Sequence, residues 1–365
     1  MPKQITIIEN GENREIGFNP NGGGVTSKIF GGKRQLGHKY NDIISLENLC
    51  LAWEEFIVGK TKRVDVIKFS RSLMDNIVEL NQSLVNKTYQ HGGYESFYIN
   101  DPKRRHIHKA SVRDRLLHHA IYRILYPFFD KTFIADSYSC RNEKGTHRAI
   151  NRFRGLFYRV SKNHTRTCWV LKCDIRKFFA SIDHDILFGI LKEYIFDKDI
   201  LWLLKNIIES FHTDSNSGVG LPLGNLTSQL FANVYMNKFD QWVKHNLKSH
   251  YYVRYADDFV FLSRDKFRLE AALLKIQAFL QDNLKLSLHP GKVFISTFAS
   301  GMDFLGWVHF PDHRVLRNTT KQRMFKWIKE SASKESLQSY LGLLGHGNSF
   351  RLRGQVMAEY WLWND

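Results

Sequence analysis

The sequence predicts an α+β protein built from more than one subdomain. Apolar residues recur at helical spacing over long stretches, for example at Leu49, Trp53 and Phe56. Short runs of β-branched and aromatic residues, such as 169–173 and 252–262, have the composition of strands. A chain of 365 residues, 43% of them hydrophobic, can bury a large core, and its length indicates two or three packed subdomains.

The first third of the chain predicts an irregular arm, a helical layer and a hairpin. Residues 1–40 are rich in Gly and Asn and show little periodicity, which favours an irregular arm. Residues 45–84 predict two or three amphipathic helices. Residues 94–108 predict two strands joined by a basic turn. A long helix is expected over 111–130, ending before Pro127 because proline lacks the amide hydrogen that a helix needs.

The middle of the chain alternates strands with helices in an order that resembles βαβ. Residues 169–173 predict a buried strand that runs directly into Asp174. The further elements expected in order are helices over 182–194 and 200–211, a loop at 220–229 leading into a helix through 239, strands at 252–263, a helix around 269–280 and a strand region over 286–295. From residue 314 onward Lys and Arg alternate with apolar residues, which predicts a basic helical subdomain.

Charge and composition favour a nucleic-acid partner inside the cell. The chain has 53 Lys and Arg against 36 Asp and Glu, a formal charge of +17, and 14% aromatic residues of the kind that stack on bases. A basic balance that serves only solubility is the alternative. The four cysteines form no Cys-x-x-Cys pair, which favours buried thiols in a reducing cytosol over a zinc site or disulfides. No apolar run approaches membrane-spanning length, so we expect a cytoplasmic protein without a membrane partner.

Paired carboxylates mark the centre of the predicted site. Asp257 and Asp258 lie between two strand-like runs, and Asp174 ends the strand at 169–173. Adjacent aspartates repel one another unless a cation lies between them. A solvated surface turn is the alternative for an isolated Asp-Asp pair. Three carboxylates on neighbouring strands instead predict a site for two divalent ions, with Mg²⁺ favoured by the all-oxygen ligands and Mn²⁺ as a substitute.

The segment Tyr255-Ala256-Asp257-Asp258 resembles the catalytic signature of reverse transcriptases. Four more blocks support the resemblance in the same chain order: 174–179, the Gly224-x-x-x-Ser228-Gln229 loop, 289–292 and 304–307. The resemblance implies an RNA-directed DNA polymerase with the right-hand fold of fingers, palm and thumb. The domains expected from it are an N-terminal arm at 1–40, fingers with the start of the palm at 41–165, an antiparallel palm backed by helices at 166–312, and a basic helical thumb at 313–365.

The resemblance also implies roles for individual residues. Asp174, Asp257 and Asp258 would hold the metal ions, with the carbonyl of Ile175 assisting, and Lys292 would lie near the leaving pyrophosphate. The residues implied to bind the deoxynucleotide are Lys103, Arg105, Phe179, Leu223 and Gly224, of which Phe179 is the steric gate against a ribose 2′-hydroxyl. The residues implied to contact template or primer are Ser228, Gln229, Phe304, Leu305, Gly306 and Trp307. For most of these the alternative is ordinary packing or a solvated basic turn.

One departure from the common pattern points to a subtype. Leu223 precedes Gly224 and Gln229 follows Ser228, where many retroelement polymerases have Gln-Gly and Ser-Pro. This version resembles the reverse transcriptases of diversity-generating retroelements, which copy RNA with frequent errors, and 141–150 and 345–349 also fit that group. The partners implied are a structured RNA template, a DNA or RNA primer, deoxynucleotides and an accessory protein oligomer.

Other functions remain open at this point. Defence-associated (anti-phage) reverse transcriptases, which use a noncoding RNA template, share parts of the pattern. An inactive, polymerase-like RNA-binding protein would not need all three carboxylates, the lysine and the gate. A different two-metal phosphoryl transferase, such as a primase or nuclease, would need neither a sugar gate nor a primer grip.

Overall fold

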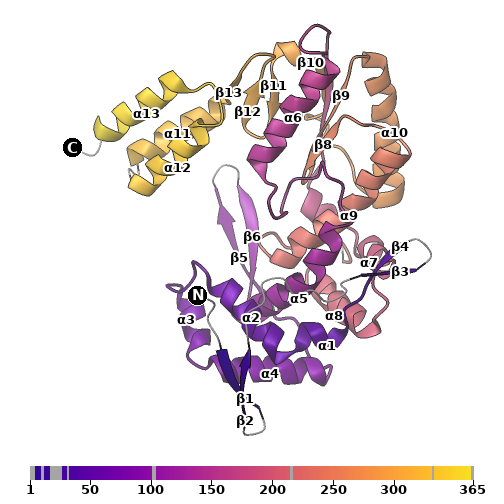
Figure 1. The fold of residues 1–365 in the computed structure, drawn as a ribbon, viewed down its shortest axis with the longest axis vertical. Helices are drawn as coiled ribbons and strands as arrows, with labels where there is room; N and C mark the ends of the chain where they lie inside the picture. The colour runs from indigo at the N-terminus through magenta and orange to yellow at the C-terminus, as the bar shows by residue number, and fades with distance from the viewer. Residues whose placement is uncertain are drawn as a thin grey trace.

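The computed structural model describes residues 5–9, 12–16, 27–30, 33–100, 104–213, 217–330 and 333–362, with side chains from residue 34 onward. Its elements form a lower helical part, an upper part with a central sheet, and a group of C-terminal helices beside that sheet (Figure 1). Among the described residues, no helix combines the length and apolar character that crossing a membrane requires.

The N-terminal segment contains strands, so the prediction of an irregular arm was wrong. Strands β1 (Ile5–Glu9) and β2 (Glu12–Ile16) pair in antiparallel fashion, and β3 (Ser27–Phe30) and β4 (Lys33–Leu36) form a second pair. The glycines suggested irregular structure, but Asn-Gly and Gly-Gly dipeptides separate the strands of each pair in the sequence. Such dipeptides are hairpin signals.

The lower part is a helical layer around the first core. Its helices are α1 (Tyr40–Ile44), α2 (Leu46–Ile57), α3 (Val64–Ser70), α4 (Leu73–Val85) and α5 (Val112–Asp130). Helix α5 continues through Pro127, contrary to the prediction that it ends before it. Proline removes one helical hydrogen bond and its ring crowds the preceding turn, at a cost of about 3 kcal/mol that burial of the following residues can offset. Phe128 and Phe129, each 1% exposed, anchor the last turn in the core.

A two-stranded hairpin rises from this layer toward the C-terminal helices (Figure 1). It consists of β5 (Tyr94–Ile99) and β6 (Arg105–Ala110), as the sequence predicted. The Asp101-Pro102 turn and Lys103 lie outside the described residues. The amide of His108 donates a hydrogen bond to the Leu223 carbonyl at 3.0 Å, which joins the hairpin to the loop before α9.

The upper part contains a four-stranded antiparallel sheet in the order β10-β7-β9-β8. Its strands are β7 (Trp169–Asp174), β8 (Tyr252–Tyr255), β9 (Asp258–Ser263) and β10 (Phe294–Thr297). The antiparallel pairing agrees with the palm that the resemblance implies, whereas the βαβ-like succession would have suggested parallel strands. Residues 286–293 are not a regular strand, because Pro290 and Gly291 interrupt the segment.

Helices cover both faces of this sheet. They are α6 (Thr146–Val160) on one face and α9 (Leu226–His245) and α10 (Lys266–Leu284) on the other. Helix α7 (His184–Lys192) packs against α9 and α8 (Lys198–Glu209), and a short 3-10 helix lies at Phe178–Ser181. Leu171 and Phe261 pack with α9 and α10 in the larger core, whereas Val170 and Val260 pack with α6 in a second core. The alternation of side chains along each strand therefore separates two cores.

The C-terminal part begins with a small sheet and ends in three helices. Strands β11 (Met302–Phe304), β12 (Trp307–His309) and β13 (Arg314–Leu316) pair in antiparallel fashion. Helices α11 (Asn318–Glu330), α12 (Lys334–Leu344) and α13 (Phe350–Leu362) follow, so the expected helical region is present. The boundaries proposed for arm, fingers, palm and thumb stay predictions.

Candidate active site

Three aspartates meet at one end of the central sheet. Asp174 ends β7 and pairs in register with Asp258, which begins β9. Asp257 lies in the tight turn between β8 and β9, and its carbonyl accepts a hydrogen bond from the Ile175 amide at 3.1 Å. The sheet register therefore brings together the carboxylates that the sequence placed on separate segments.

A buried arginine supports the turn that carries Asp257 and Asp258. Ala256 has a left-handed backbone conformation, with φ of 55°. The Arg254 guanidinium donates a hydrogen bond through Nη1 to the Ala256 carbonyl at 3.0 Å. It also donates to both carboxylate oxygens of Asp240, at 2.8 and 2.6 Å, and to Ser137 Oγ at 3.0 Å. Both side chains of this Arg254–Asp240 pair are fully buried, so the pair forms a rigid support beneath the turn.

Sequence reasoning missed Arg254 and Asp240. The available signal was one charged residue within the apolar strand Tyr252–Tyr255, because a charge in a buried strand requires a partner. Asp240 could not be identified as that partner, since it lies on α9 and no local pattern connects the two positions.

The three aspartate carboxylates repel one another and are partly buried from solvent. Burial raises the pKa of Asp258 to about 6, and the charges of Asp174 and Asp257 act in the same direction against the opposing charge of Lys172. Burial and Asp174 also raise the pKa of Asp257. Lys292 Nζ lies 2.8 Å from Asp174 Oδ1, and Lys172 Nζ lies 3.6 Å from Asp258 Oδ2. Two lysines thus offset part of the negative charge.

The residues at this sheet end fit a divalent cation. Asp258 Oδ1 is buried and has no hydrogen-bond partner among the described residues, which leaves an acceptor directed at no donor. Among the same residues, no group of three Asp, Glu, His or Cys side chains is placed so that the three together could hold one metal ion. An open arrangement suits Mg²⁺, which commonly takes one or two protein carboxylates and completes its shell with substrate phosphates and water.

The predicted nucleotide residues lie on segments that hydrogen-bond to one another. Phe179, half-buried in the 3-10 helix, accepts a backbone hydrogen bond from Leu221 at 2.8 Å. Leu223 accepts from His108 of β6. Gly224 has φ of 110°, and a Cβ there would lie 3.1 Å from Ile107 Cγ2, so backbone conformation and space both require glycine. The loop therefore connects the Phe179 segment to the β5–β6 hairpin.

The basic residues predicted to bind the triphosphate can be placed only in part. Arg105 begins β6 and is exposed, and its charge opposes a small part of the rise in the pKa of Asp257 that burial and Asp174 cause. The guanidinium therefore lies within electrostatic reach of the carboxylates. Lys103 lies outside the described residues. The sequence did not single out Lys172, whose ammonium lies nearer the site and donates to the Asp303 carbonyl at 2.7 Å.

The residues predicted to contact template or primer differ in accessibility. Leu305 and Gly306 form the turn between β11 and β12, with φ of 52° and 85°, and both are partly exposed. Phe304 and Trp307 flank this turn with 0% and 1% exposure, so they act as its packed base. On the first turns of α9, Ser228 is buried while Gln229 is partly exposed.

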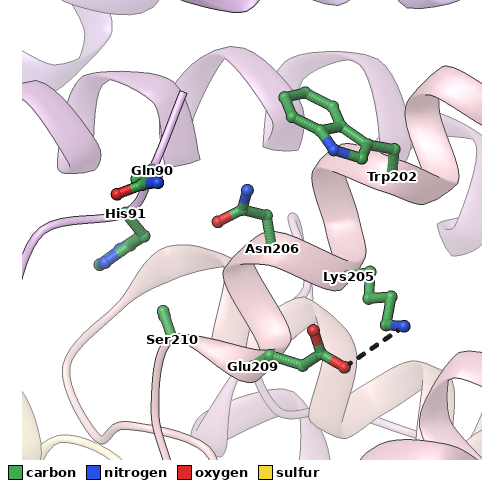
Figure 2. A pocket seen from close by; sticks show the side chains of 7 residues that line it. All are labelled: Gln90, His91, Trp202, Lys205, Asn206, Glu209 and Ser210. Atoms are coloured by element: carbon green, nitrogen blue, oxygen red, sulfur yellow. Dashed lines mark ion pairs between the residues drawn. The ribbon is translucent and has the colours of Figure 1, made fainter. Parts of the chain in front are cut away.

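A separate pocket shares no residue with this site. It has a volume of about 430 Å³ and lies between α8 and the loop before β5, lined by Gln90, His91, Trp202, Lys205, Asn206, Glu209 and Ser210 (Figure 2). Several of its polar groups already have partners within the protein. Lys205 pairs with Glu209 at 3.6 Å, and Asn206 donates to the Tyr89 carbonyl at 3.0 Å.

Comparison with known proteins matches residues 99–309 to the reverse transcriptase (RNA-dependent DNA polymerase) family. Protein YkfC of Escherichia coli K12 is 25% identical over 319 residues, which cover 76% of this chain and 81% of that protein. The group II intron-encoded protein LtrA of Lactococcus lactis is 23% identical over 326 residues, covering 70% and 53% respectively. The retron Ec83 reverse transcriptase of E. coli is 24% identical over 199 residues, covering 51% and 63%. The matched region thus spans most of YkfC but a smaller share of the other two proteins.

Proposed function

Because this chain belongs to the reverse transcriptase (RNA-dependent DNA polymerase) family, we propose that it copies an RNA template into cDNA at the aspartate cluster. The observation that carries the proposal is the meeting of Asp174, Asp257 and Asp258 at one sheet end, with a buried carboxylate oxygen of Asp258 left without a donor. Within the described residues, the positive charge near this cluster comes from Lys172, Lys292 and Arg105. A family match over more than half of the chain supports the same reaction.

Each group around the cluster then has a task. The three carboxylates would hold two Mg²⁺ ions, which when bound would activate the primer 3′-hydroxyl and stabilise the charge that develops as pyrophosphate leaves. The Ile175 carbonyl assists the carboxylates. Arg105 and Lys103 bind the triphosphate, Arg105 with the two-pronged geometry of a guanidinium. Lys292, whose Nζ lies next to Asp174, is the candidate general acid for the departing pyrophosphate.

A primer-extension assay tests this proposal directly. The purified chain is given an RNA template with an annealed DNA or RNA primer and deoxynucleotides, with Mg²⁺ and with EDTA. We expect Mg²⁺-dependent extension to the end of the template. A protein that binds RNA without extending any primer is an inactive relative, and one that cleaves RNA or starts chains from nucleotides alone is a different phosphoryl transferase.

We expect Phe179→Val to relax the choice of sugar. Valine leaves room for a ribose 2′-hydroxyl where the phenylalanine ring excludes it, so the preference for dNTP over rNTP should fall about tenfold or more, ~1.4 kcal/mol of discrimination. Single-nucleotide incorporation with dNTP and rNTP measures the ratio of kcat/KM. Phe188→Val on α7, another half-buried phenylalanine, is the control. An unchanged ratio in Phe179→Val means that the ring serves packing alone.

The subtype we propose is a diversity-generating retroelement enzyme that makes frequent errors during mutagenic retrohoming. The proposal rests on Leu223. Many other retroelement polymerases carry a glutamine at this position, and that glutamine helps to hold the incoming nucleotide in register. Leucine offers no such hydrogen bond. A structured RNA and an accessory protein oligomer are the partners that accompany this role. The alternative is a defence-associated enzyme that copies a noncoding RNA accurately.

We therefore expect Leu223→Gln to make synthesis more accurate. Each ~1.4 kcal/mol of restored discrimination reduces errors about tenfold, and the gain should be largest at template adenines. Sequencing of cDNA copied from one defined RNA by wild type, Leu223→Gln and Leu226→Gln gives the error spectrum. Leu226→Gln controls for a glutamine elsewhere in the same segment. Low and equal error rates at adenine in all three proteins would argue for the defence-type alternative.

A further inference from the structure

The loop 345–349 between α12 and α13 packs against the turn that the proposed function assigns to the primer. Gly347 lies beneath the indole of Trp307, the residue that directly follows the Leu305–Gly306 turn. That indole is 1% exposed, so it fills its space between the loop and the small sheet. The position of the loop and the position of the turn are therefore linked through one side chain.

Space alone requires glycine at 347. A Cβ there would overlap the six-membered ring of Trp307, at 2.6 Å from Cη2 and 2.9 Å from Cε3, and closer still to Cζ3. Real Cβ atoms do not approach carbon this closely, and the backbone of Gly347 does not have the positive φ that would favour glycine for another reason. A methyl group here must displace the indole, which contributes all three of the nearest atoms.

The same loop is fastened to β13 and α6. The Asn348 amide donates to the Arg314 carbonyl at 2.9 Å, and the Arg314 amide donates to Asn348 Oδ1 at 3.3 Å. The Arg314 guanidinium donates through Nε to the His346 carbonyl and through Nη1 to Asn151 Oδ1 of α6 at 2.8 Å. The His346 ring also stacks on His147 of α6, with 3.5 Å between the ring centroids.

The turn itself is held from the other side by the start of α11. The Arg317 amide donates to the Gly306 carbonyl at 3.1 Å, and the Arg317 guanidinium pairs with Asp303 Oδ2 at 2.9 Å. Asp303 in turn accepts through its carbonyl from Lys172, the lysine beside Asp258. The turn is thus enclosed between the C-terminal helical part and the aspartate cluster.

We propose that loop 345–349 positions the primer-contacting turn at Leu305 and Gly306, with Gly347 and Trp307 as positioning residues. The loop holds the indole and the indole holds Leu305 and Gly306, so the loop fixes where the turn meets the primer end. This inference deepens the proposed function and rests on it. Displacing the indole should misplace the primer 3′ end while leaving the deoxynucleotide contacts at Phe179 and Leu223 unchanged.

The test compares Gly347→Ala with Gly342→Ala, whose added Cβ meets no atom within 4 Å in the described part of the chain. We expect Gly347→Ala to raise KM for the primer–template about tenfold and to shorten the products made per binding event. Its KM for dNTP should stay within about twofold of wild type. Gly342→Ala should behave as wild type in both, and thermal unfolding of each protein measures any loss of fold.

A second substitution tests whether the effect of Gly347→Ala acts through the Trp307 indole. The three atoms nearest to a Cβ at 347 belong to the benzo ring of the indole, the ring farther from the Trp307 backbone. Phenylalanine has a single ring and no second ring fused to it, so Trp307→Phe should make room for the methyl group. We expect Gly347→Ala/Trp307→Phe to bind primer–template no worse than Trp307→Phe alone, a strong departure from additivity. Asn348→Ala, which removes only one side-chain hydrogen bond, should raise KM for primer–template a few-fold without unfolding the protein.

Several results would overturn the proposal that loop 345–349 positions the turn. They are a wild-type KM for primer–template in both Gly347→Ala and Asn348→Ala, additive effects in the double variant, or an equal rise of KM for dNTP. If Gly347→Ala does not fold, the Asn348→Ala and double-variant measurements decide. Failure of the proposed function is a different result, since wild type itself would then extend no primer.

Discussion

Asp257→Asn is expected to abolish DNA synthesis, lowering the rate of primer extension at least about a thousandfold, or ~4 kcal/mol of transition-state stabilisation. The amide removes a negative charge from the cluster that would hold the metal ions. Asp174→Asn should have the same effect and also leave Lys292 without its carboxylate partner. Single-turnover extension on an RNA template with saturating Mg²⁺ measures the loss.

The fold should tolerate the change at Asp257. Burial and the nearby charge of Asp174 raise the pKa of Asp257, so the ionised side chain is disfavoured in the folded protein and a neutral amide removes that penalty. We therefore expect an equal or slightly higher free energy of unfolding at neutral pH, and unchanged RNA binding. Asp282→Asn, an exposed aspartate on α10, is the control for the chemical change. Substantial extension by Asp257→Asn or Asp174→Asn would disprove the metal assignment.

Arg254→Met should destabilise the protein by roughly 3–5 kcal/mol, because it leaves the charge of Asp240 buried without its partner. Both carboxylate oxygens of Asp240 accept from this guanidinium, and among the described residues the Tyr252 hydroxyl, 2.8 Å from Oδ1, would be the one donor left to this carboxylate. Chemical denaturation with urea measures the difference. Arg268→Met, at an exposed position of α10, should change stability by less than about 0.5 kcal/mol.

A double variant separates the structural role of the pair from its effect on the turn. Arg254→Met/Asp240→Leu removes both buried charges together, so much of the lost stability should return. Activity should not return with it, since the Ala256 carbonyl still lacks the 3.0 Å hydrogen bond that holds the left-handed turn. Full activity in the stable double variant would show that the turn holds its shape without Arg254. A single variant as stable as wild type would refute the buried-pair argument itself.

The aspartate cluster shows which features of the site a local sequence pattern can predict and which it cannot. The strands at 169–174 and 252–263 could be predicted because β-branched and aromatic runs have local causes, and the sheet confirms them. That the two strands are neighbours, with Asp174 opposite Asp258, depends on register between segments about 80 residues apart. The sequence predicted the three carboxylates on neighbouring strands, but no local pattern indicated that Asp174 would lie opposite Asp258.

Other parts of the chain show where local reasoning misleads. Glycine-rich composition at 1–40 suggested irregular structure, although the same residues are typical of hairpin turns. Pro127 was expected to end a helix, yet packing of Phe128 and Phe129 carries α5 past it. In both cases a local preference worth a few kcal/mol at most competes with strand pairing or core burial, which the wider fold provides.

By itself the sequence determined the class of the protein, its basic character and the carboxylates at which we propose that the reaction takes place, because each follows from residue type and short-range spacing. Only the tertiary structure decided that Arg254 of β8 and Asp240 of α9 form one buried pair under the turn at Ala256. It also decided that Gly347 lies against Trp307. Contacts of this kind join residues that are distant along the chain, and their selection depends on how helices and sheets pack, which no short stretch of sequence encodes.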